Sequence, residues 1–570
     1  MKAKKVLALL MALGMLSSSL AGCSSEEAAS SGDASSSSST QESSSGSESS
    51  SEGESSSSDG ELKVTLDGVE KISEEPITLK VFCPKGANTA NYGDLEYLKA
   101  YSEATNISVE WEQPSSDLAT DRMNVILASN ELPDMFWNVR YDQYTQLRQS
   151  NAIIDLREYA RDCENLNKVV EENPGVDKYF IEPDGKMYIL PLFDGLSINQ
   201  PLIVRQDWLD QLGMEVPETM DDWHDYWVAV RDNDVNGNGD PNDEIPFTAE
   251  KTDYLRDLVS VFDMMDGFFV DVADGHQIKF SNIDPRYKDF LTWMNQLWNE
   301  NLIDHAIFSN DKDALESNVA LNLVGSYSGK LNGQFNTYMT TMPEHIEGFK
   351  LAGAPPIESS TGKHLHSNVT PLARLDNSAG GNVVTVTSQY PAECVKFCDW
   401  FYDFTPGTGG GFYGIFGYEG VTFEYTNAEK TEYEYTDLVL NNPDGLSPQQ
   451  FLQTLTTRNQ YAAYTPPIGS FKMWAPETEE AYERLEPYYE ESLEYTLPTN
   501  LPLTDAENKE IRSTMADINT YVDEMVIAFI NGKEPLDNFD AYVDTVNNMG
   551  IQKILDIYNA SYELWNQDRN

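Results

Sequence analysis

The sequence predicts an α/β protein with more than one domain. Strand-like and helical stretches alternate between residues 76 and 160, which favours a parallel sheet with helices on both faces. A second alternating stretch begins at Leu202–Arg205, and the chain from Thr504 onward is helical in pattern. Roughly 500 residues follow the N-terminal region, which is more than one domain usually contains.

The first stretch is expected to supply one sheet. Its strands alternate apolar and polar residues, as in Pro76–Cys83. We expect strands at 76–83, 107–111, 134–138 and 186–192, and helices at 95–104, 118–130 and 141–160. A later strand at 383–387 resembles a return to this sheet, and an amphipathic helix is expected at 391–404.

The second stretch is expected to form a second sheet and its covering helices. We predict strands at 202–205, 319–324 and 350–354, and helices at 208–212 and 219–231. Near the C-terminus, Thr504 and Glu507 fit a capping box. Gly532 suits the position just past a helix end, and Pro535 begins another helix. The apolar stripes of these C-terminal helices indicate core faces.

The N-terminus predicts export and lipid anchoring. A basic start precedes an apolar run, Val6–Leu20, that is shorter than the ~20 residues a membrane span needs. Cys23 directly follows Leu-Ala-Gly, which resembles the lipobox of bacterial lipoproteins. This implies a signal peptide at 1–22 and a lipid on Cys23. The alternative is an ordinary export signal with a chance cysteine.

Residues 24–60 contain 20 serines in 37 positions, so this part of the chain has too few apolar side chains to form a core. We interpret residues 23–75 as a flexible tether. A wall-spanning or glycosylated stalk is the alternative.

Composition excludes several classes of function. The net charge of −56 argues against nucleic-acid binding and against a strongly anionic ligand. Only six histidines are present and they form no transition-metal cluster; Cys394 and Cys398 fit buried apolar positions better than a metal pair or a disulfide. The sequence has no G-x-S-x-G, no Walker loop and no Cys/His nucleophile context, so it carries no signature of these enzyme classes.

One loop carries a specific metal-binding pattern, because alternating Asp and Asn with glycines presents the oxygens that Ca²⁺ prefers. Two frames are open: one starts at Asp232 and uses Asp234, Asn236, Asp240 and Asp243. The other starts at Asp234. Its ligands would be Asp234, Asn236, Asn238, Asp240 through its carbonyl, Asp243 and Glu244. A solvated Asx-rich turn without an ion is the alternative.

Three segments together resemble extracellular solute-binding protein family 1 of ABC importers. Residues 208–223 (WLDQLGMEVPETMDDW) are similar to its P-x-T-x-D-E-[FW] element, with Asp222 where Glu is usual. Residues 132–136 resemble its third strand, and 531–543 with Met549-Gly550 resemble the C-terminal region of a lipoprotein sub-group of Gram-positive bacteria. The resemblance extends from about Ile77 to Trp565.

This resemblance implies a two-lobed periplasmic-binding-protein-like fold with hinge strands and a ligand in the cleft. The predicted lobes are 76–190 with 356–405, and 191–355 with 406–570, with crossings near 186–194, 355–356 and 404–411. Because the best-known members bind maltose and other oligosaccharides, it implies a lipid-anchored subunit that captures a carbohydrate at the outer face of a bacterial, Gram-positive membrane. The permease and ATPase subunits would be other chains. The protein itself would be a monomer that binds its ligand and is no enzyme.

The resemblance also favours the second calcium frame, since it is similar to the loop of family members that bind alginate oligosaccharides. One extra residue precedes Asp243-Glu244 here, which weakens those two assignments. The ion would be structural and lie away from the cleft.

The predicted carbohydrate contacts are aromatic and polar residues that follow strand ends or accompany a crossing, where ligands bind in open α/β sheets. They are Asn88, Tyr92, Trp137, Asn138, Tyr141, Asn199, Arg205, Tyr327, Tyr413, Tyr418, Glu419 and Trp474. The rival functions are a surface glycosidase or polysaccharide lyase, a binding protein for a peptide or amino-sugar derivative, and an adhesin on a stalk.

Overall fold

The computed structural model describes residues 64–567 apart from some short gaps. The gaps are Thr65, Asp67, Ser197, 252–255, 376–379, Thr431, Asp444, 459–463, 466–470 and Lys472. All described residues belong to one compact unit, Leu62–Asn570. The predicted signal peptide, Cys23 and residues 23–63 of the predicted tether lie outside the described residues. Among the helices that are described, none is long and apolar enough to cross a membrane.

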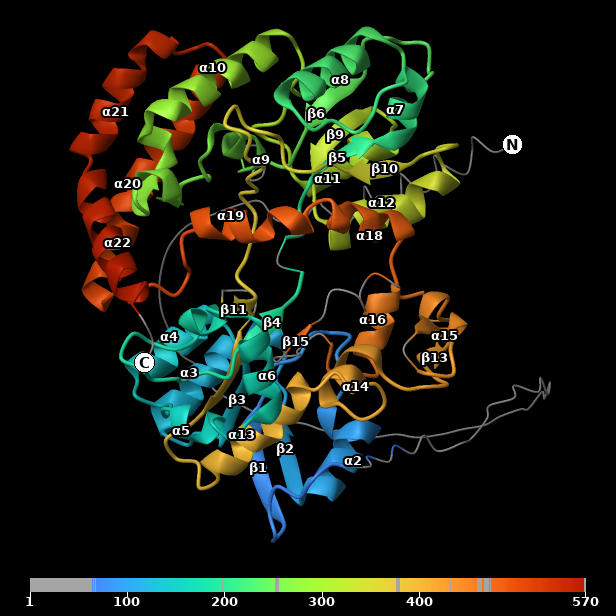
Figure 1. Ribbon diagram of the computed structural model, residues 1–570, viewed down its shortest axis with the longest axis vertical. Helices are drawn as coiled ribbons and strands as arrows, with labels where there is room; N and C mark the ends of the chain where they lie inside the picture. Colours follow the sequence, from blue (N-terminus) through green and yellow to red (C-terminus); the bar gives the residue numbers. More distant parts are fainter. Residues whose placement is uncertain are drawn as a thin grey trace, which may run out of the picture. The chain divides into compact units, whose positions relative to one another are not determined.

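The first sheet has four strands in the order β12-β3-β1-β2 (Figure 1). They are β1 (Ile77–Phe82), β2 (Ile107–Glu112), β3 (Met135–Val139) and β12 (Gly381–Val384). β1 pairs in parallel with β2 and β3, whereas β12 runs antiparallel to β3. The connecting helices are α2 (Glu96–Thr105), α3 (Ala119–Ser129) and α4 (Tyr141–Gln149), and α13 (Pro391–Asp399) follows β12. The predicted strand–helix alternation is confirmed.

The second sheet has the order β10-β5-β9-β6. Its strands are β5 (Leu202–Arg205), β6 (Ile245–Thr248), β9 (Val324–Ser328) and β10 (Leu351–Gly353), with helices α7 (Gln206–Leu212), α8 (Met220–Asp232) and α11 (Lys312–Ala320). The predicted strand at 319–324 is wrong. Leu315 and Val319 are buried one turn apart on α11, so Val319 completes a helical stripe and the strand begins only at Val324.

The C-terminal helices confirm their predicted signals. They are α20 (Asp505–Ile530), α21 (Phe539–Asn548) and α22 (Ile551–Trp565). Thr504 caps α20, because its side chain accepts from the backbone N–H of Glu507 while the Glu507 carboxylate accepts from the backbone N–H of Thr504 at 2.8 Å. Gly532 follows α20 with a φ of +73°, which favours glycine.

The remaining helices and strands connect or flank these layers. They are α5 (Arg157–Ala160), α6 (Glu164–Glu172), α9 (Arg256–Val259), β7 (Phe268–Asp271), β8 (Gln277–Phe280), α10 (Pro285–Asn299), α12 (Asn336–Thr341), α14 (Gly410–Phe416), β13 (Phe423–Tyr425), β14 (Tyr433–Tyr435), α15 (Asp437–Leu440), α16 (Pro448–Gln453), α18 (Pro476–Glu483) and α19 (Tyr489–Tyr495).

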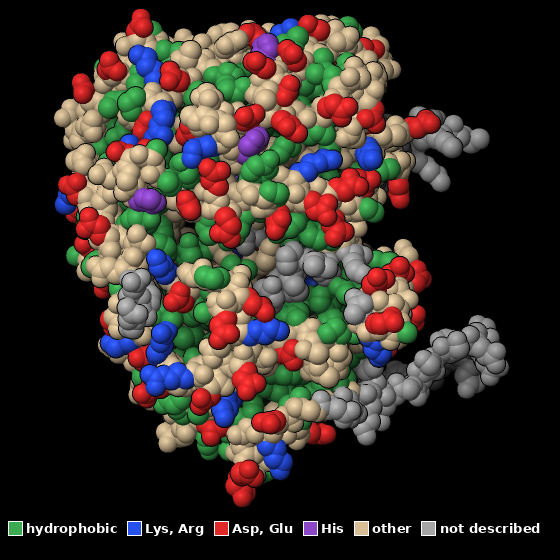
Figure 2. All heavy atoms as spheres, in the orientation of Figure 1, with side chains coloured by type: hydrophobic (Ala, Val, Ile, Leu, Met, Phe, Trp, Pro, Cys, Tyr) green, Lys and Arg blue, Asp and Glu red, His purple; other side chains and the backbone are tan. Residues whose placement is uncertain are grey.

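The buried side chains define two lobes. One core draws on residues 79–193 and 373–473, which we call the first lobe. Two further cores draw on residues 198–369 and 481–562, which we call the second lobe. The four cysteines in the described ranges are buried and form no disulfide, as expected for Cys394 and Cys398. Acidic side chains are spread over the visible face of the molecule (Figure 2).

Three crossings join the lobes, between β4 (Leu192–Asp194) and β5, between β10 and β11 (Ala373–Arg374), and between β15 (Tyr464–Thr465) and α18. The strands β11, β4 and β15 pair side by side in one small sheet. The first crossing lies at the end of the predicted range 186–194.

Two predicted boundaries need correction. The crossing predicted at 404–411 is wrong, because Phe412 and Phe416 of α14 bury their rings in the first core. Residues 406–458 therefore belong to the first lobe. The boundary predicted at 355–356 is too early, since Leu365 and Val369 still pack in the second-lobe cores.

Candidate functional site

The carboxyl ends of the parallel strands in both sheets point toward the crossings. The chain segment that leaves the first lobe through β4 pairs antiparallel with β12, through Leu190 and Asn382. Because β12 is also antiparallel to β3, β3 runs in the same direction as that segment. In the second lobe, β5 runs away from the crossing, β9 is antiparallel to β5, and β6 is parallel to β9. Ligands bind beyond such strand ends in open α/β sheets, so these two faces are the candidate cleft.

The second-lobe side of the candidate cleft carries a polar network. Gln334 donates from Nε2 to Oε1 of Glu250 at 2.9 Å, and its own Oε1 accepts from the backbone N–H of Lys330 at 3.1 Å. Asn336 accepts at Oδ1 from the backbone N–H of Ala475 at 3.0 Å, which holds the third crossing against α12. Trp474, the residue before Ala475, packs against the first-lobe core.

Trp474 is half-buried and meets Phe471 edge to face at 5.6 Å. Its role as a ligand contact stays a prediction. Sequence reasoning missed Glu250 because it did not recognise β6, and it missed Gln334 and Asn336 because it placed the strand of β9 too early, at 319–324. The alternation in Ile245-Pro-Phe-Thr248 was the available signal.

Four predicted residues are exposed or half-buried, three of them in the first lobe. Asn88 is exposed in the loop after β1. Asn138 is the last residue but one of β3 and has a φ of +55°, and its backbone N–H donates to Oδ1 of Asn382 at 3.0 Å. Tyr141 is half-buried at the start of α4, and burial raises its pKa. The backbone carbonyl of Asn199, in the first crossing, accepts from the N–H of Leu331 at 2.8 Å.

Four predicted aromatic contacts are instead buried. Their exposed fractions are 0% for Tyr92, 1% for Trp137, 2% for Tyr327 and 4% for Tyr418. Trp137 points into the first core, where it meets Phe401 edge to face at 5.0 Å. Successive strand residues point to opposite faces, and the inward one at a strand end belongs to the core. We therefore withdraw these four residues as stacking platforms.

Arg205, another predicted ligand contact, is also buried. It is 3% exposed, and its Nη2 lies 2.7 Å from Oδ2 of Asp207. Its guanidinium packs over the rings of Trp208 and Phe349, at 4.4 and 4.5 Å from their centroids. A buried cation needs such partners, so Arg205 stabilises the second lobe rather than contacting ligand.

Tyr413 and Glu419 lie on the first lobe and have partners there. The Tyr413 ring stacks on Tyr97 with centroids 5.7 Å apart, and its hydroxyl donates to the carbonyl of Gly407 at 2.8 Å. Glu419 is exposed and forms an ion pair with Lys430 at 2.7 Å. A ligand would have to compete with these contacts.

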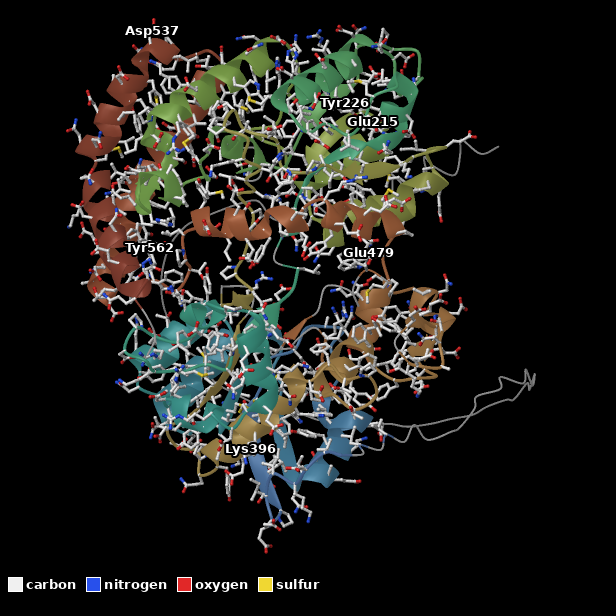
Figure 3. The ribbon with its side chains drawn as sticks, in the orientation of Figure 1. Glu215, Tyr226, Lys396, Glu479, Asp537 and Tyr562 are labelled. Carbon is white, nitrogen blue, oxygen red and sulfur yellow. The ribbon has the colours of Figure 1, made fainter. Side chains whose placement is uncertain are left out.

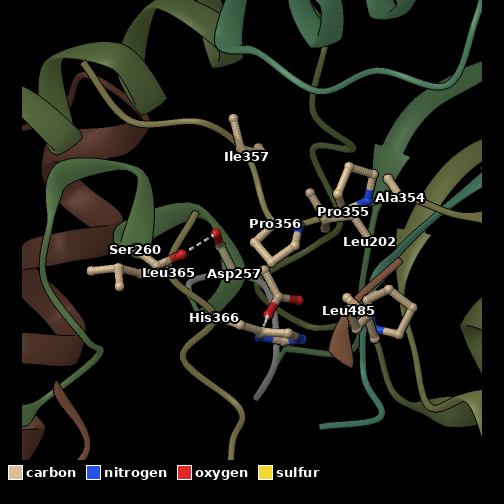
Figure 4. A pocket seen from close by; sticks show the side chains of 11 residues that line it. Leu202, Asp257, Ser260, Ala354, Pro355, Pro356, Ile357, Leu365, His366 and Leu485 are labelled. Atoms are coloured by element: carbon tan, nitrogen blue, oxygen red, sulfur yellow. Dashed lines mark hydrogen bonds and ion pairs between the residues drawn. The ribbon is translucent and has the colours of Figure 1, made fainter. Parts of the chain in front are cut away.

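A small pocket beside the second crossing is structural. It is lined by Leu202, Asp257, His366 and neighbouring residues and has a volume of about 10 Å³ (Figure 4). Ser328 Oγ donates to Oδ2 of Asp257 at 2.7 Å, and Nδ1 of His366 lies 3.4 Å from Asp257 Oδ1. This volume suits about one water molecule, so the pocket cannot hold a sugar ring.

The Asp/Asn loop after α8 folds around its own side chains. Asp234 accepts at Oδ2 from the N–H of Gly239 at 2.9 Å, and Asn236 accepts at Oδ1 from the N–H of Asn238 at 2.9 Å. The Asp243 carboxylate accepts from the amides of Asn236 and Asn238, at 3.0 and 2.7 Å. Asp234, Asn236, Asn238 and Asp243 therefore belong to one turn.

The geometry distinguishes the two calcium frames. Asp232 is exposed and paired with Arg231 at 2.7 Å, outside the turn, which contradicts the frame that begins there. Burial raises the pKa of Glu244, and the nearby Asp243 and Asp234 raise it further. Across the described ranges, no three His, Cys, Asp or Glu side chains form a metal site by themselves. A cation here would therefore also need amide and carbonyl oxygens.

Comparisons with known proteins agree with this architecture. Residues 87–403 match the family described as bacterial extracellular solute-binding protein. The fructooligosaccharide ABC transporter substrate-binding protein FusA of Streptococcus pneumoniae serotype 4 is 27% identical over 267 residues, which make up 43% of this chain and 48% of that protein. The chain thus matches about half the length of this relative.

Solved structures show the same fold. An HMO binding, ABC-transporter associated solute-binding protein from Bifidobacterium longum infantis has a TM-score of 0.66 at 17% identity, covering 87% of this chain and 100% of that one. The alginate-binding protein AlgQ2, solved without calcium ion, has a TM-score of 0.57 at 21% identity, covering 86% and 99%. A FusA EF-hand mutant with fructo-nystose has a TM-score of 0.58 at 20% identity, with the same coverage. The predicted two-lobed α/β fold is confirmed.

Proposed function

The chain belongs to the bacterial extracellular solute-binding protein family, and from this premise we propose that it captures a carbohydrate for an ABC importer. The observation that carries the proposal is the pair of strand-end faces at the three crossings. Half-buried polar and aromatic side chains lie on both of them, including Asn138 and Tyr141 on the first lobe and Glu250 and Gln334 on the second, with Trp474 at the third crossing. Aromatic faces with a few fixed polar groups suit sugar rings and hydroxyls.

An oligosaccharide is the expected ligand, and a neutral one is favoured. FusA is named for fructooligosaccharides, and the Bifidobacterium protein for HMO binding. The net charge of −56 would repel a polyuronate, and Glu250 adds a carboxylate at the candidate cleft. The net charge and the carboxylate of Glu250 therefore support a neutral ligand for this chain.

The protein would bind its ligand without converting it. We place it at the outer face of a Gram-positive membrane, anchored through lipid on Cys23 and acting as a monomer. Closure of the lobes on the sugar would create the surface that permease subunits recognise.

We further propose a structural calcium ion in the loop of residues 234–244. Oδ1 of Asp234 and Oε2 of Glu244 are buried and accept no hydrogen bond in the structure, so the loop has acceptor capacity that a cation would use. Asp234, Asn236, Asn238, Asp243, Glu244 and the carbonyl of Asp240 would hold it. Calcium would supply the positive charge that offsets three neighbouring carboxylates.

The test of the main proposal is a thermal-shift screen against neutral, amine-bearing and acidic oligosaccharides, followed by calorimetry on any hit. We expect a neutral oligosaccharide to bind and to contract the protein in solution scattering. Trp474→Ala should weaken binding roughly 5- to 150-fold, taking base–aromatic stacking as the nearest magnitude. Glu347→Gln, an exposed position away from the strand ends, is the control. Sugar cleavage at enzymatic rates, or failure of every neutral oligosaccharide to bind, would refute the proposal.

A further inference from the structure

A second cavity lies beside the first and second crossings, where Gly195 and Leu372 contribute to its lining. It has a volume of about 870 Å³ and is lined by residues 172–179 of the first lobe and by α18, α19 and α22 of the second. None of its described lining residues directly follows β1, β2, β3, β6 or β9. Its volume falls within the range of roughly 300–1,000 Å³ that is typical of small-molecule sites. We call it the α19–α22 cavity.

Aromatic rings from both lobes line the α19–α22 cavity. Tyr562 lies on α22 (Figure 3). Its ring stacks on Trp565 with centroids 5.8 Å apart, and Tyr179 of the first lobe meets Trp565 edge to face at 5.3 Å. Tyr482 and Tyr489 also line it, and their hydroxyls donate to the carbonyls of Gly195 and Thr370 at 3.2 Å. Tyr179 and Tyr562 are half-buried.

Carboxylates are arranged along one side of the same cavity. Glu486, Glu490 and Glu494 line it at spacings of four residues, which places them one above another along α19 and the turn before it. Glu490 and Glu494 act electrostatically on Tyr179 and Tyr562, respectively, so they lie near these rings. Like charges at this spacing repel one another, and a bound cation would relieve that repulsion.

The ammonium group of Lys178 already lies against an aromatic ring of this cavity. Nζ of Lys178 lies 5.8 Å from the centroid of the Trp565 ring and donates to Oδ1 of Asn566 at 3.2 Å. Lys178 is the only Lys or Arg among the described lining residues. The cavity thus combines aromatic faces, which attract ammonium groups and stack on sugar rings, with carboxylates that need counter-charges.

We propose that the α19–α22 cavity is a second ligand site, for a saccharide that carries protonated amino groups. The ring faces of the saccharide would stack on Tyr562 and Tyr179. Its ammonium groups would pair with Glu490 and Glu494. This proposal rests on the carbohydrate-binding function proposed above, but it concerns a different surface of the protein.

The experiment measures binding of a chitosan-derived trisaccharide to the soluble chain by calorimetry. We expect Tyr562→Ala to weaken binding at least about tenfold. Glu490→Gln should also weaken it, and added salt should reduce the difference between Glu490→Gln and the unmodified chain. Glu563→Gln, an exposed change on α22 outside the lining, should bind like the unmodified chain. Tyr562→Phe keeps the ring and should retain most of the affinity, which separates loss of stacking from loss of folding.

Different outcomes separate this proposal from the main one. Trp474→Ala should impair the neutral oligosaccharide and leave the amine-bearing trisaccharide bound. Normal binding by Tyr562→Ala, equal affinity for an acidic trisaccharide of galacturonate, or loss of the amine-bearing ligand in Trp474→Ala would overturn the second site. Failure of every neutral oligosaccharide to bind would instead overturn the main proposal.

Discussion

Removal of calcium should destabilise the second lobe through the loop of residues 234–244. The loop places Asp234, Asp243 and Glu244 around one turn, and two of their carboxylate oxygens are buried without a hydrogen-bond partner in the structure. An ion that binds only the folded loop stabilises it by about 2.7 kcal/mol when its free concentration is 100 times the Kd. For a lobe of more than 150 residues, each kcal/mol shifts Tm by roughly 2–4 °C, so chelation should lower Tm by about 5–10 °C.

Glu244→Gln should separate the ion's effect from that of the loop itself. Burial and the nearby Asp243 and Asp234 raise the pKa of Glu244, so without an ion its charged form costs stability at neutral pH. Without the ion, the protonated Glu244 side chain stabilises the folded protein at low pH, and this stability is lost as pH rises through the raised pKa of Glu244. The neutral glutamine should therefore make the chelated protein at least as stable as the chelated unmodified chain. With a ligand charge removed, the variant should lose most of the rise in Tm on adding calcium.

The assay is differential scanning calorimetry in EDTA, then with excess calcium, and with magnesium as the ion control. Asp232→Asn is the matched variant, because Asp232 is exposed and paired with Arg231 outside the turn. It should keep the full calcium shift. If the unmodified chain melts at the same temperature in EDTA and in calcium, and elemental analysis finds no calcium, the reasoning is wrong.

Three further results are expected. Trp137→Ala should lower the free energy of unfolding by about 3–5 kcal/mol in denaturant titrations, because the ring is in the first core, and a merely weaker ligand affinity with unchanged stability would contradict this. Burial alone would raise the pKa of Asp271, but Lys279 and Arg286 outweigh it and hold the pKa below the usual 3.8. The stability that these two ion pairs provide is therefore lost as pH falls below about 4, and Asp271→Asn should flatten the acid side of a plot of unfolding free energy against pH. The four buried thiols, whose pKa values burial raises, should resist a thiol reagent in the native protein and react on unfolding; rapid native reaction would refute their burial.

Local patterns in the sequence determined much of the fold. The strands at β1, β2, β3 and β5, the cap at Thr504 and the turn at Gly532 all depend on residues close together in the chain. The Asp/Asn loop was likewise predictable, because its side chains fold onto neighbours within one turn. Such local signals do not depend on how the rest of the chain packs.

Only the tertiary structure decided which side chains face the cleft. Trp137 follows the rule for strand ends, yet Phe401 from a distant helical turn covers it. The lobe that contains α14 was equally undetermined, because an apolar stripe can bury against either core. The α19–α22 cavity brings Tyr179 beside Trp565 across most of the chain. Periodicity is set by neighbours in sequence, whereas burial and the meeting of side chains depend on which surfaces pack together, and no short stretch of sequence encodes that.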